Sequence, residues 1–414
     1  MKKSQKSKLE SLLNTKSQQL LHDLVITNDN PGSIVADFNM LLDFIGTKGM
    51  ASGGKYGFFP MGKLTEINSK LTHSVKLNLK RPQQKAFPHI HGLHLLLRST
   101  GLVYLKTNGK KRYLLLDEPT LQSWHRLNVT EQYFTLLEAW LLHGNNQILL
   151  ERDFGFPDHM SKCSNFMRHF EKSNIYTPDQ KKEMFHYFPG WHNLALLQMF
   201  GFMKIKSPQK KIDKFWLIDQ IQCTHLTRIL IPSLEKDIVE RGLEFKNIEC
   251  FGEWQSLLQP FFPEWKNNLI MKEPEFKEGL YIFEISIGSV WRRISISSDQ
   301  ELEVLSDAIL EAFDFDDDHM YQFTYTNRKG IIVEVVSPEF GEPPLTTDVR
   351  VGDLDLSPGD SFYYLYDFGD QWEFTLVLED IKTNHKKKSK PTLLESYGEA
   401  PDQYENDEDD YEFE

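Results

Sequence analysis

The ten residues LYDFGDQWEF, from Leu365 to Phe374, constrain the fold of this chain more than any other stretch. The runs FYYLY before the turn and WEFTLVL after it are rich in aromatic and β-branched residues, which favour strands. Between them lies DFGD at residues 367–370, where an Asp side chain can bond turn amides and Gly369 can adopt a positive φ. The pattern predicts a β-hairpin and, with it, a sheet near the C-terminus.

The segments around this hairpin predict an α+β domain over residues 280–400. Residues 272–279 form a polar linker containing Pro and Gly. After it, YIFEISIGSVWRRISIS alternates with period two, Ser298 and Glu301 form a capping box for a helix, and HMYQFTY and GIIVEVV read as strands. Strands with one early helix predict a mixed or antiparallel sheet. The acidic residues 401–414 predict a disordered tail.

The N-terminal part predicts a mostly helical region. Residues 1–30 form a polar arm. In residues 31–145, three predicted helices (one capped by Ser33, one at 62–71 and one at 88–100) precede LVYLK and KRYLLL, which flank Asn-Gly. At 414 residues the chain is too long for one core, and we expect several domains. Helices followed by a hairpin are the outline of a winged helix.

A second copy of this outline is predicted in residues 146–271. LLRSTGLVYLK aligns with LQMFGFMKIK, which places Gly101 opposite Gly201, and KFWLIDQI (214–221) supplies the return strand. Each block is an apolar helix, a glycine and a strand. Similarity at a fixed offset indicates an internal duplication.

The segments SVWRR, HMYQF and YDFGDQW together resemble the plasmid pRiA4b ORF-3-like family over about residues 280–400. The resemblance implies an α+β domain of a family that occurs on plasmids and in transposon-associated genes and has no established activity. The family-motif residues of this chain are Trp291, Arg292, His319, Tyr366, Asp367, Phe368, Gly369, Asp370 and Trp372.

Two interpretations of these motif residues stay open. In the favoured one, a buried Arg292 pairs with an Asp of a neighbouring strand, and the aspartates of the turn act locally. In the other, Asp367, Asp370 and one of Asp316, Asp317 or Asp318, with His319 nearby, hold Mg or Mn for phosphodiester hydrolysis, because hard cations prefer carboxylate oxygens. The first predicts no cofactor and no enzyme, whereas the second predicts a metal-dependent hydrolase.

Charge is distributed unevenly along the chain. Residues 1–113 hold 18 Lys and Arg against 6 Asp and Glu, whereas residues 280–414 hold 10 against 32. A basic N-terminal part indicates a polyanionic partner, for which DNA is the first candidate. The predicted contact residues lie on the helix before the hairpin and on the hairpin: Arg98, Lys106, Lys110, Lys111 and Arg112. The alternative is a protein-interaction module in which these lysines only solubilise the hairpin.

Other classes of protein are disfavoured. The three cysteines have no metal-ligand spacing, which fits a reducing cytosol, and no apolar run approaches the length of a membrane span. His89, His91 and His94 lie on one predicted helix, where we expect surface or capping contacts. We therefore expect a cytoplasmic accessory or regulatory binding protein of a bacterium or mobile element.

Overall fold

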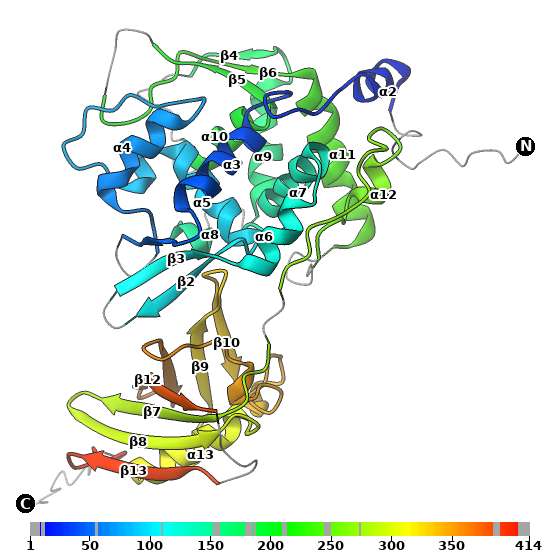
Figure 1. Cartoon of the computed structure of the whole chain (residues 1–414). Helices are drawn as coiled ribbons and strands as arrows, with labels where there is room; N and C mark the ends of the chain where they lie inside the picture. Colours follow the sequence, from blue (N-terminus) through cyan, green and yellow to red (C-terminus); the bar gives the residue numbers. More distant parts are fainter. Residues whose placement is uncertain are drawn as a thin grey trace, which may run out of the picture. The chain divides into compact units, whose positions relative to one another are not determined.

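The structure is a computed structural model of the chain, and it divides into two compact units (Figure 1). It describes residues 9, 13–53, 57–108, 111–151, 158–178, 185, 188–208, 213–243, 250–272, 275–383 and 390–404. Unit 1 comprises Met1–Leu105 and Arg112–Lys272, and unit 2 comprises Lys106–Lys111 and Glu273–Glu414. Among the described residues, no helix combines the length and apolar character needed to cross a membrane.

Unit 1 is mostly helical, as predicted. It contains both segments that the sequence predicts as separate domains, residues 31–145 and 146–271, except for the hairpin tip Lys106–Lys111. Its helices are α2 (Thr15–His22), α3 (Ile34–Ile45), α4 (Met61–Lys70), η1 (Gln84–Ala86), α5 (Pro88–Ser99), α6 (Glu118–His125), α7 (Val129–Leu141), α8 (Asn146–Leu149), α9 (His159–Phe166), η2 (Met167–Phe170), α10 (Trp191–Met199), α11 (His225–Arg241) and α12 (Gln255–Leu258).

Two small sheets of three strands accompany these helices. Their strands are β1 (Met50–Ala51), β2 (Val103–Asn108) and β3 (Lys111–Leu116), and β4 (Ile175–Tyr176), β5 (Met203–Lys206) and β6 (Gln220–Cys223). The strand orders are β1-β3-β2 and β4-β6-β5. β1 is antiparallel to β3, and β4 and β5 are both antiparallel to β6. In both sheets, therefore, the short first strand pairs with the return strand of the following hairpin.

The predicted repeat of helix, glycine and strand is confirmed. α5 is followed by Gly101 with φ 69° and by β2, and α10 by Gly201 with φ 75° and by β5. Glycine suits both positions because left-handed backbone costs it little. The predicted return strand at 214–221 is displaced, since β6 begins only at Gln220.

The two helices of the repeat form the centre of unit 1 and contact each other. All twelve residues of α5 are buried. A Cβ added at Gly92 of α5 would lie 2.8 Å from Leu196 Cγ of α10, so only glycine permits this close approach. α7 also packs here, and Tyr133 donates a hydrogen bond to Phe200 O at 2.9 Å. Both helices are therefore interior elements along most of their length.

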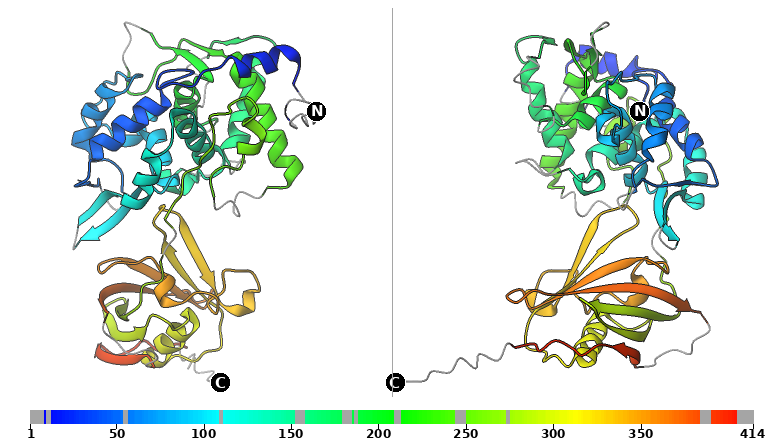
Figure 2. Two further views of the ribbon diagram at one scale, coloured as in Figure 1. Left: turned by 45° about the vertical axis from the view of Figure 1, so that its right-hand side comes forward. Right: turned by 90° about the vertical axis from the view of Figure 1, so that its left-hand side faces the viewer.

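Unit 2 is an antiparallel sheet of seven strands with one helix packed on it (Figure 2). Its elements are β7 (Leu280–Ile287), β8 (Val290–Ser297), α13 (Leu302–Phe313), β9 (Tyr321–Thr326), β10 (Ile332–Val336), η4 (Pro338–Phe340), η5 (Val351–Asp353), β11 (Ser361–Tyr366), β12 (Trp372–Lys382) and β13 (Thr392–Tyr397). The strand order is β10-β9-β11-β12-β7-β8-β13. The predicted α+β domain is thus observed with a purely antiparallel sheet.

The core of unit 2 lies between the sheet and α13. Alternate residues of the central strands face α13, among them Phe283, Phe362 and Phe374, and α13 contributes Leu305 and Ile309. The helix begins at Leu302 with Glu301 as the N-cap residue, which makes no side-chain capping bond. The predicted capping box is therefore wrong: the Ser298 hydroxyl instead accepts a hydrogen bond from Gly279 N–H at 3.0 Å.

Candidate functional site

The predicted hairpin is β11–β12, in which Tyr366 pairs with Trp372 across a loop of residues 367–371. Asp367 and Gln371 adopt left-handed φ values of 54° and 57°, and Gly369 does not, contrary to the prediction. The Asp367 carboxylate accepts a hydrogen bond from Gly369 N–H at 2.7 Å. Asp367 therefore has the local turn role that the sequence predicted, while Gly369 supplies the amide.

Arg292 is buried, but its partners are backbone carbonyls and not an aspartate. Its guanidinium donates to Ala312 O at 2.8 Å, to Tyr397 O at 3.1 Å and to Gly398 O at 3.2 Å. The ring of Phe313 lies 4.8 Å from the guanidinium carbon. The predicted Arg–Asp pair is wrong because the C-terminal end of α13 supplies free carbonyls next to β8. Arg292 joins the helix end to β13.

His319 lies beside the turn, as the motif suggested. Its Nε2 is 3.5 Å from Asp367 Oδ2 and 3.6 Å from Asp318 Oδ1. The Tyr366 hydroxyl accepts hydrogen bonds from the backbone N–H groups of Asp318 and His319 at 2.9 and 3.1 Å. A hydrogen bond from Tyr404 lowers the pKa of Asp318. The loop before β9 is therefore fixed by two tyrosines.

The remaining motif residues do not gather around one point. Asp370 is exposed, Trp291 stacks on Tyr397 with ring centroids 6.0 Å apart, and Phe368 contacts Phe340 at 5.3 Å. Trp372 packs edge-on against Phe315 at 5.1 Å. Within the described residues, no three His, Cys, Asp or Glu side chains are arranged to hold a metal ion, so Asp367, Asp370 and His319 do not form such a group.

The basic residues predicted as a nucleic-acid contact on α5 and the first hairpin differ in exposure. Arg98 is 2% exposed, so its guanidinium does not reach the surface where a phosphate could bind. Lys106 and Lys111 are exposed, and Arg112 is half-buried. Lys110 lies outside the described residues. The helix before the hairpin therefore cannot contribute Arg98 to the predicted contact.

The three histidines of α5 are interior residues, contrary to the expected surface contacts. His89, His91 and His94 are between 1% and 2% exposed. His89 bonds to Gln198 of α10 at 2.9 Å, and His91 Nε2 lies 3.4 Å from Glu151. Burial lowers the pKa of all three, that of His89 to about 4. The α5 surface is therefore neutral where it meets α10.

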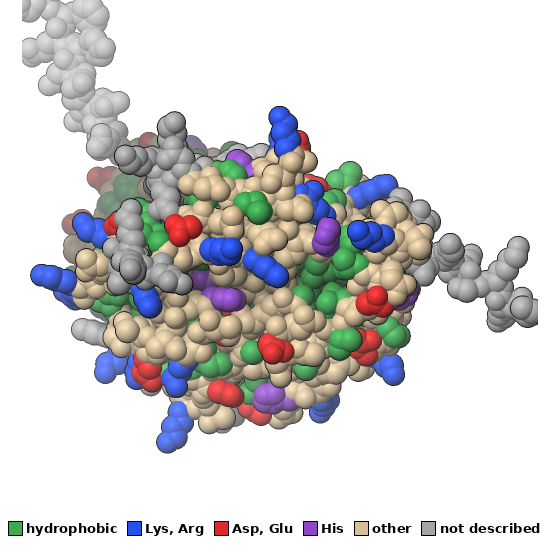
Figure 3. All heavy atoms as spheres, turned by 90° about the horizontal axis from the view of Figure 1, so that it is seen from above, with side chains coloured by type: hydrophobic (Ala, Val, Ile, Leu, Met, Phe, Trp, Pro, Cys, Tyr) green, Lys and Arg blue, Asp and Glu red, His purple; other side chains and the backbone are tan. Residues whose placement is uncertain are grey.

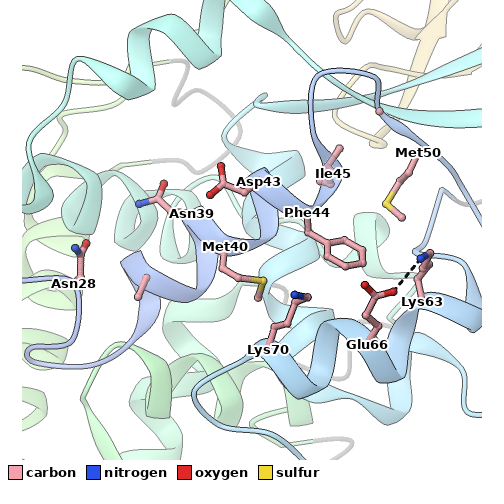
Figure 4. A pocket seen from close by; sticks show the side chains of 12 residues that line it. Asn28, Asn39, Met40, Asp43, Phe44, Ile45, Met50, Lys63, Glu66 and Lys70 are labelled. Carbon is pink, nitrogen blue, oxygen red and sulfur yellow. Dashed lines mark hydrogen bonds and ion pairs between the residues drawn. The ribbon is translucent and has the colours of Figure 1, made fainter.

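A groove of about 880 Å³ lies along α3 and α4 (Figure 4). The side chains that line it include apolar and charged ones: Met40, Phe44 and Met50, and Asp43, Lys63, Glu66 and Lys70. Lys63 and Glu66 form an ion pair of 2.9 Å. Two cations and two carboxylates leave this groove without net charge, so it does not favour a polyanion.

A stronger concentration of cations lies on the second hairpin and on residues 75–81. Along β5 the side chains alternate, Met203 being buried and Lys204 and Lys206 exposed. Asn78 N–H donates to Asp213 O at 2.9 Å, and Asp219 N–H donates to Lys206 O at 2.8 Å. Residues 75–81, which are distant in sequence, therefore lie beside the two arms of the second hairpin, so three segments meet here.

We call the exposed cations of these three segments the basic face: Lys76, Lys80, Arg81, Lys204, Lys206 and Lys214. In the part of the chain that the structure describes, none of the six forms an ion pair. The same segments hold only two carboxylates, Asp213 and Asp219. Figure 3 shows Lys, Arg and His side chains gathered across the middle of the side that carries β4, β5 and β6. The sequence predicts this second hairpin, but the predicted contact residues lie on the first one.

The match to a family model lies in unit 2. Residues 284–412 match the family model described as plasmid pRiA4b ORF-3-like protein, which confirms the predicted resemblance of the C-terminal part. No curated protein matches the chain. A protein of unknown function from Methanosarcina mazei Go1, known from a crystal structure, shares 25% sequence identity with this chain. The match covers 30% of this chain and 72% of the Methanosarcina chain, with a TM-score of 0.27. The basic face lies outside residues 284–412, which the family model matches.

Proposed function

We propose that this protein is a nucleic-acid-binding accessory or regulatory protein that contacts the phosphate backbone through the basic face. The observation that carries the proposal is the set of six exposed cations without ion-pair partners in the described residues. Lys and Arg that neutralise phosphates release condensed counterions, which favours binding at low salt. The pRiA4b ORF-3-like domain supplies no established activity, so the proposal rests on unit 1.

The order of elements in unit 1 supports a winged-helix arrangement. α3, β1, α4, α5 and the β2–β3 hairpin follow one another, and β1 pairs with β3. α10 and the β5–β6 hairpin repeat the last part, with β4 paired to β6. We infer a duplicated winged helix, in which the basic face belongs to the second wing and to the segment beside it.

Burial decides which part of this arrangement meets the nucleic acid. In helix-turn-helix proteins the recognition helix lies in the major groove and must be exposed. Here α5 is buried along its whole length, and in α10 only two of nine residues, Trp191 and Gln198, escape burial. The wings would therefore contact the phosphate backbone, and no helix would read the edges of the bases in a groove.

Fluorescence anisotropy of the full chain with a labelled DNA duplex, titrated at several salt concentrations, tests the proposal. We expect Lys206→Glu with Lys214→Glu to weaken binding and to lower the salt slope by about 2. Lys106→Glu with Lys111→Glu changes the charge equally on the other hairpin and should leave the affinity within about twofold of the parent. Equal losses in the two double variants would contradict the basic face as the site.

A protein ligand is the second candidate, and the groove along α3 and α4 favours it. Met40 and Met50 are flexible apolar side chains that adapt to differently shaped partners, and Phe44 adds an aromatic contact. A peptide-array screen with the full chain tests this candidate. A groove ligand should be lost in Met40→Lys and retained in the variant with Lys206→Glu and Lys214→Glu.

A further inference from the structure

Phe215 is the one large aromatic side chain that unit 1 exposes in its described part. It is 47% exposed, and the other exposed large hydrophobic residues there are aliphatic: Val25, Met61, Leu150, Ile175, Val239 and Ile270. Phe215 directly follows Lys214 in sequence, and both are exposed, so Phe215 lies next to a cation of the basic face. An exposed phenyl ring among unpaired lysines has no role in the core of unit 1.

The backbone on both sides of Phe215 is fixed. Asp213 O accepts the hydrogen bond from Asn78 N–H, and Asp213 also forms an isolated β-bridge with Leu77. On the other side, Trp216 is 6% exposed and its indole N–H donates to Ser207 Oγ at 3.0 Å. The Trp216 ring packs on His89 with centroids 4.8 Å apart. The exposed Phe215 therefore lies between two anchored residues, Asp213 and Trp216.

We infer that the basic face binds single-stranded nucleic acid and that an unpaired base stacks on Phe215. The inference rests on the proposed function, and it specifies the form of the nucleic acid. Sites for single strands combine cations that follow the backbone with aromatic side chains on which bases stack. In a duplex the faces of the bases are covered by their neighbours, so Phe215 has no base face to contact. The burial of α5 and of most of α10 agrees with binding that ignores sequence.

The geometry also explains why stacking costs little here. A ring whose backbone is already fixed loses little conformational freedom when a base covers it. Lys214 directly precedes Phe215, and Lys206 directly precedes the Ser207 that holds Trp216. These two lysines can meet phosphates next to the stacked base. A stack on one aromatic ring contributes about 5- to 150-fold in affinity, as the free energy of base–aromatic stacking implies.

The test measures the affinity of the full chain for an oligothymidylate, an oligouridylate and a mixed-sequence DNA duplex of equal length. We expect the single strands to bind more tightly than the duplex, with the deoxy and ribo strands separating DNA from RNA as the source. Phe215→Ala should weaken single-strand binding roughly 5- to 150-fold and leave duplex binding unchanged. Phe215→Trp should keep the preference for single strands. A 2-aminopurine base in the strand should be quenched on binding to the parent and not on binding to Phe215→Ala.

The outcomes separate this inference from the proposed function. If Phe215→Ala leaves single-strand affinity and quenching unchanged while Lys206→Glu with Lys214→Glu abolishes binding, stacking is overturned and the basic face stands. If no probe binds at low salt, both are overturned. Because Phe215 is exposed, Phe215→Ala should melt at the parent temperature, which controls for misfolding.

Discussion

The carboxylate of Glu138 in α7 accepts a hydrogen bond from the backbone N–H of Gly252 at 2.6 Å, inside unit 1. The same carboxylate accepts Trp254 N–H at 2.8 Å. Two turns earlier on α7, Glu131 accepts Lys266 N–H and Asn267 N–H at 2.9 and 2.7 Å. Two acidic side chains of one helix thus hold the segment 250–268, which contains no long helix of its own.

We predict that Glu138→Ala lowers the free energy of unfolding by roughly 2–5 kcal/mol, because two buried N–H groups lose their acceptor. Urea unfolding followed by tryptophan fluorescence measures this, since Trp254 is fully buried. Glu118→Ala, at an exposed position of α6, is the control and should change stability by less than about 0.5 kcal/mol. An equal effect of the two variants would show that the segment does not depend on Glu138.

The free energy of unfolding of the parent protein should depend on pH through Glu138. Burial raises the pKa of this carboxyl from 4.5 to about 7. The folded state therefore holds its proton more tightly than the unfolded state, and the contribution to stability is present below pH 4.5 and lost as the pH rises through 7. Linkage puts this loss on the order of 3 kcal/mol. Glu138→Gln, which cannot ionise, should not show it, and a parent and variant with parallel pH profiles would contradict the prediction.

The buried histidines should act in the opposite direction. Burial lowers the pKa of His89 from 6.5 to about 4 and that of His159 to about 3. The unfolded state takes up these protons first, so stability is present above pH 6.5 and is lost as the pH falls toward 4. The slope of the unfolding free energy against pH gives the number of protons taken up on unfolding. We expect His89→Gln to lower this number by about one between pH 6.5 and 4. His125→Gln on α6 is the control.

In unit 2, the adjacent residues Arg292 and Arg293 should respond differently to the same change. Arg292 itself is buried and donates to four backbone carbonyls, those of Trp291, Ala312, Tyr397 and Gly398. Arg292→Lys removes its planar set of donors and should cost about 2–4 kcal/mol. Arg293 pairs with Glu379 at 2.6 Å nearer the surface, and Arg293→Lys should cost about 1 kcal/mol or less. Melting temperatures of the two variants check this, and a larger loss for Arg293→Lys would be inconsistent with the contacts of Arg292.

The two aspartates of the turn should also differ. Asp367→Ala removes the acceptor of Gly369 N–H and places Ala at a left-handed φ, which should cost about 1–3 kcal/mol. Asp367→Asn keeps an acceptor and a residue that tolerates this φ, so it should recover most of the loss. Asp370→Asn should be nearly neutral because the side chain is exposed. We expect no shift in the parent melting temperature with Mg²⁺ or Mn²⁺; a shift abolished by Asp370→Asn would support the metal alternative.

The parts of the fold that sequence predicted are those with local causes. The β2–β3 hairpin follows from Asn-Gly between two strand-like runs, and the helix ends before Gly101 and Gly201 follow from the freedom of glycine. The YDFGDQW hairpin follows from its turn residues, although the sequence could not tell that Asp367 and Gln371, not Gly369, take the positive φ. The choice depends on how many residues the pairing of Tyr366 with Trp372 leaves in the loop.

What sequence could not predict depends on contacts between distant residues. Three polar histidines on one helix are typical of a solvent-facing stripe, yet those of α5 are buried. His89 contacts Gln198 of α10, and His94 packs on the rings of Phe58 and Phe59. Arg292 finds carbonyls contributed by the end of α13 and by residues 397–398, which no spacing relates to it. The basic face likewise brings residues 76–81 next to the second hairpin through the bond between Asn78 and Asp213. In the sequence, the repeat around Gly201 indicates the hairpin that carries Lys204, Lys206 and Lys214 of this face.

The strand order of unit 2 determines when this domain can be completed during synthesis. β7–β8 and β9–β10 are neighbours in sequence and can pair as they leave the ribosome, but they lie on opposite sides of β11–β12 in the sheet. A nascent chain that ends before Ser361 therefore has two hairpins and no strand between them. The last-made hairpin is the one that unites the sheet, so a truncated transcript or an early stop codon yields two unjoined halves with exposed strand edges.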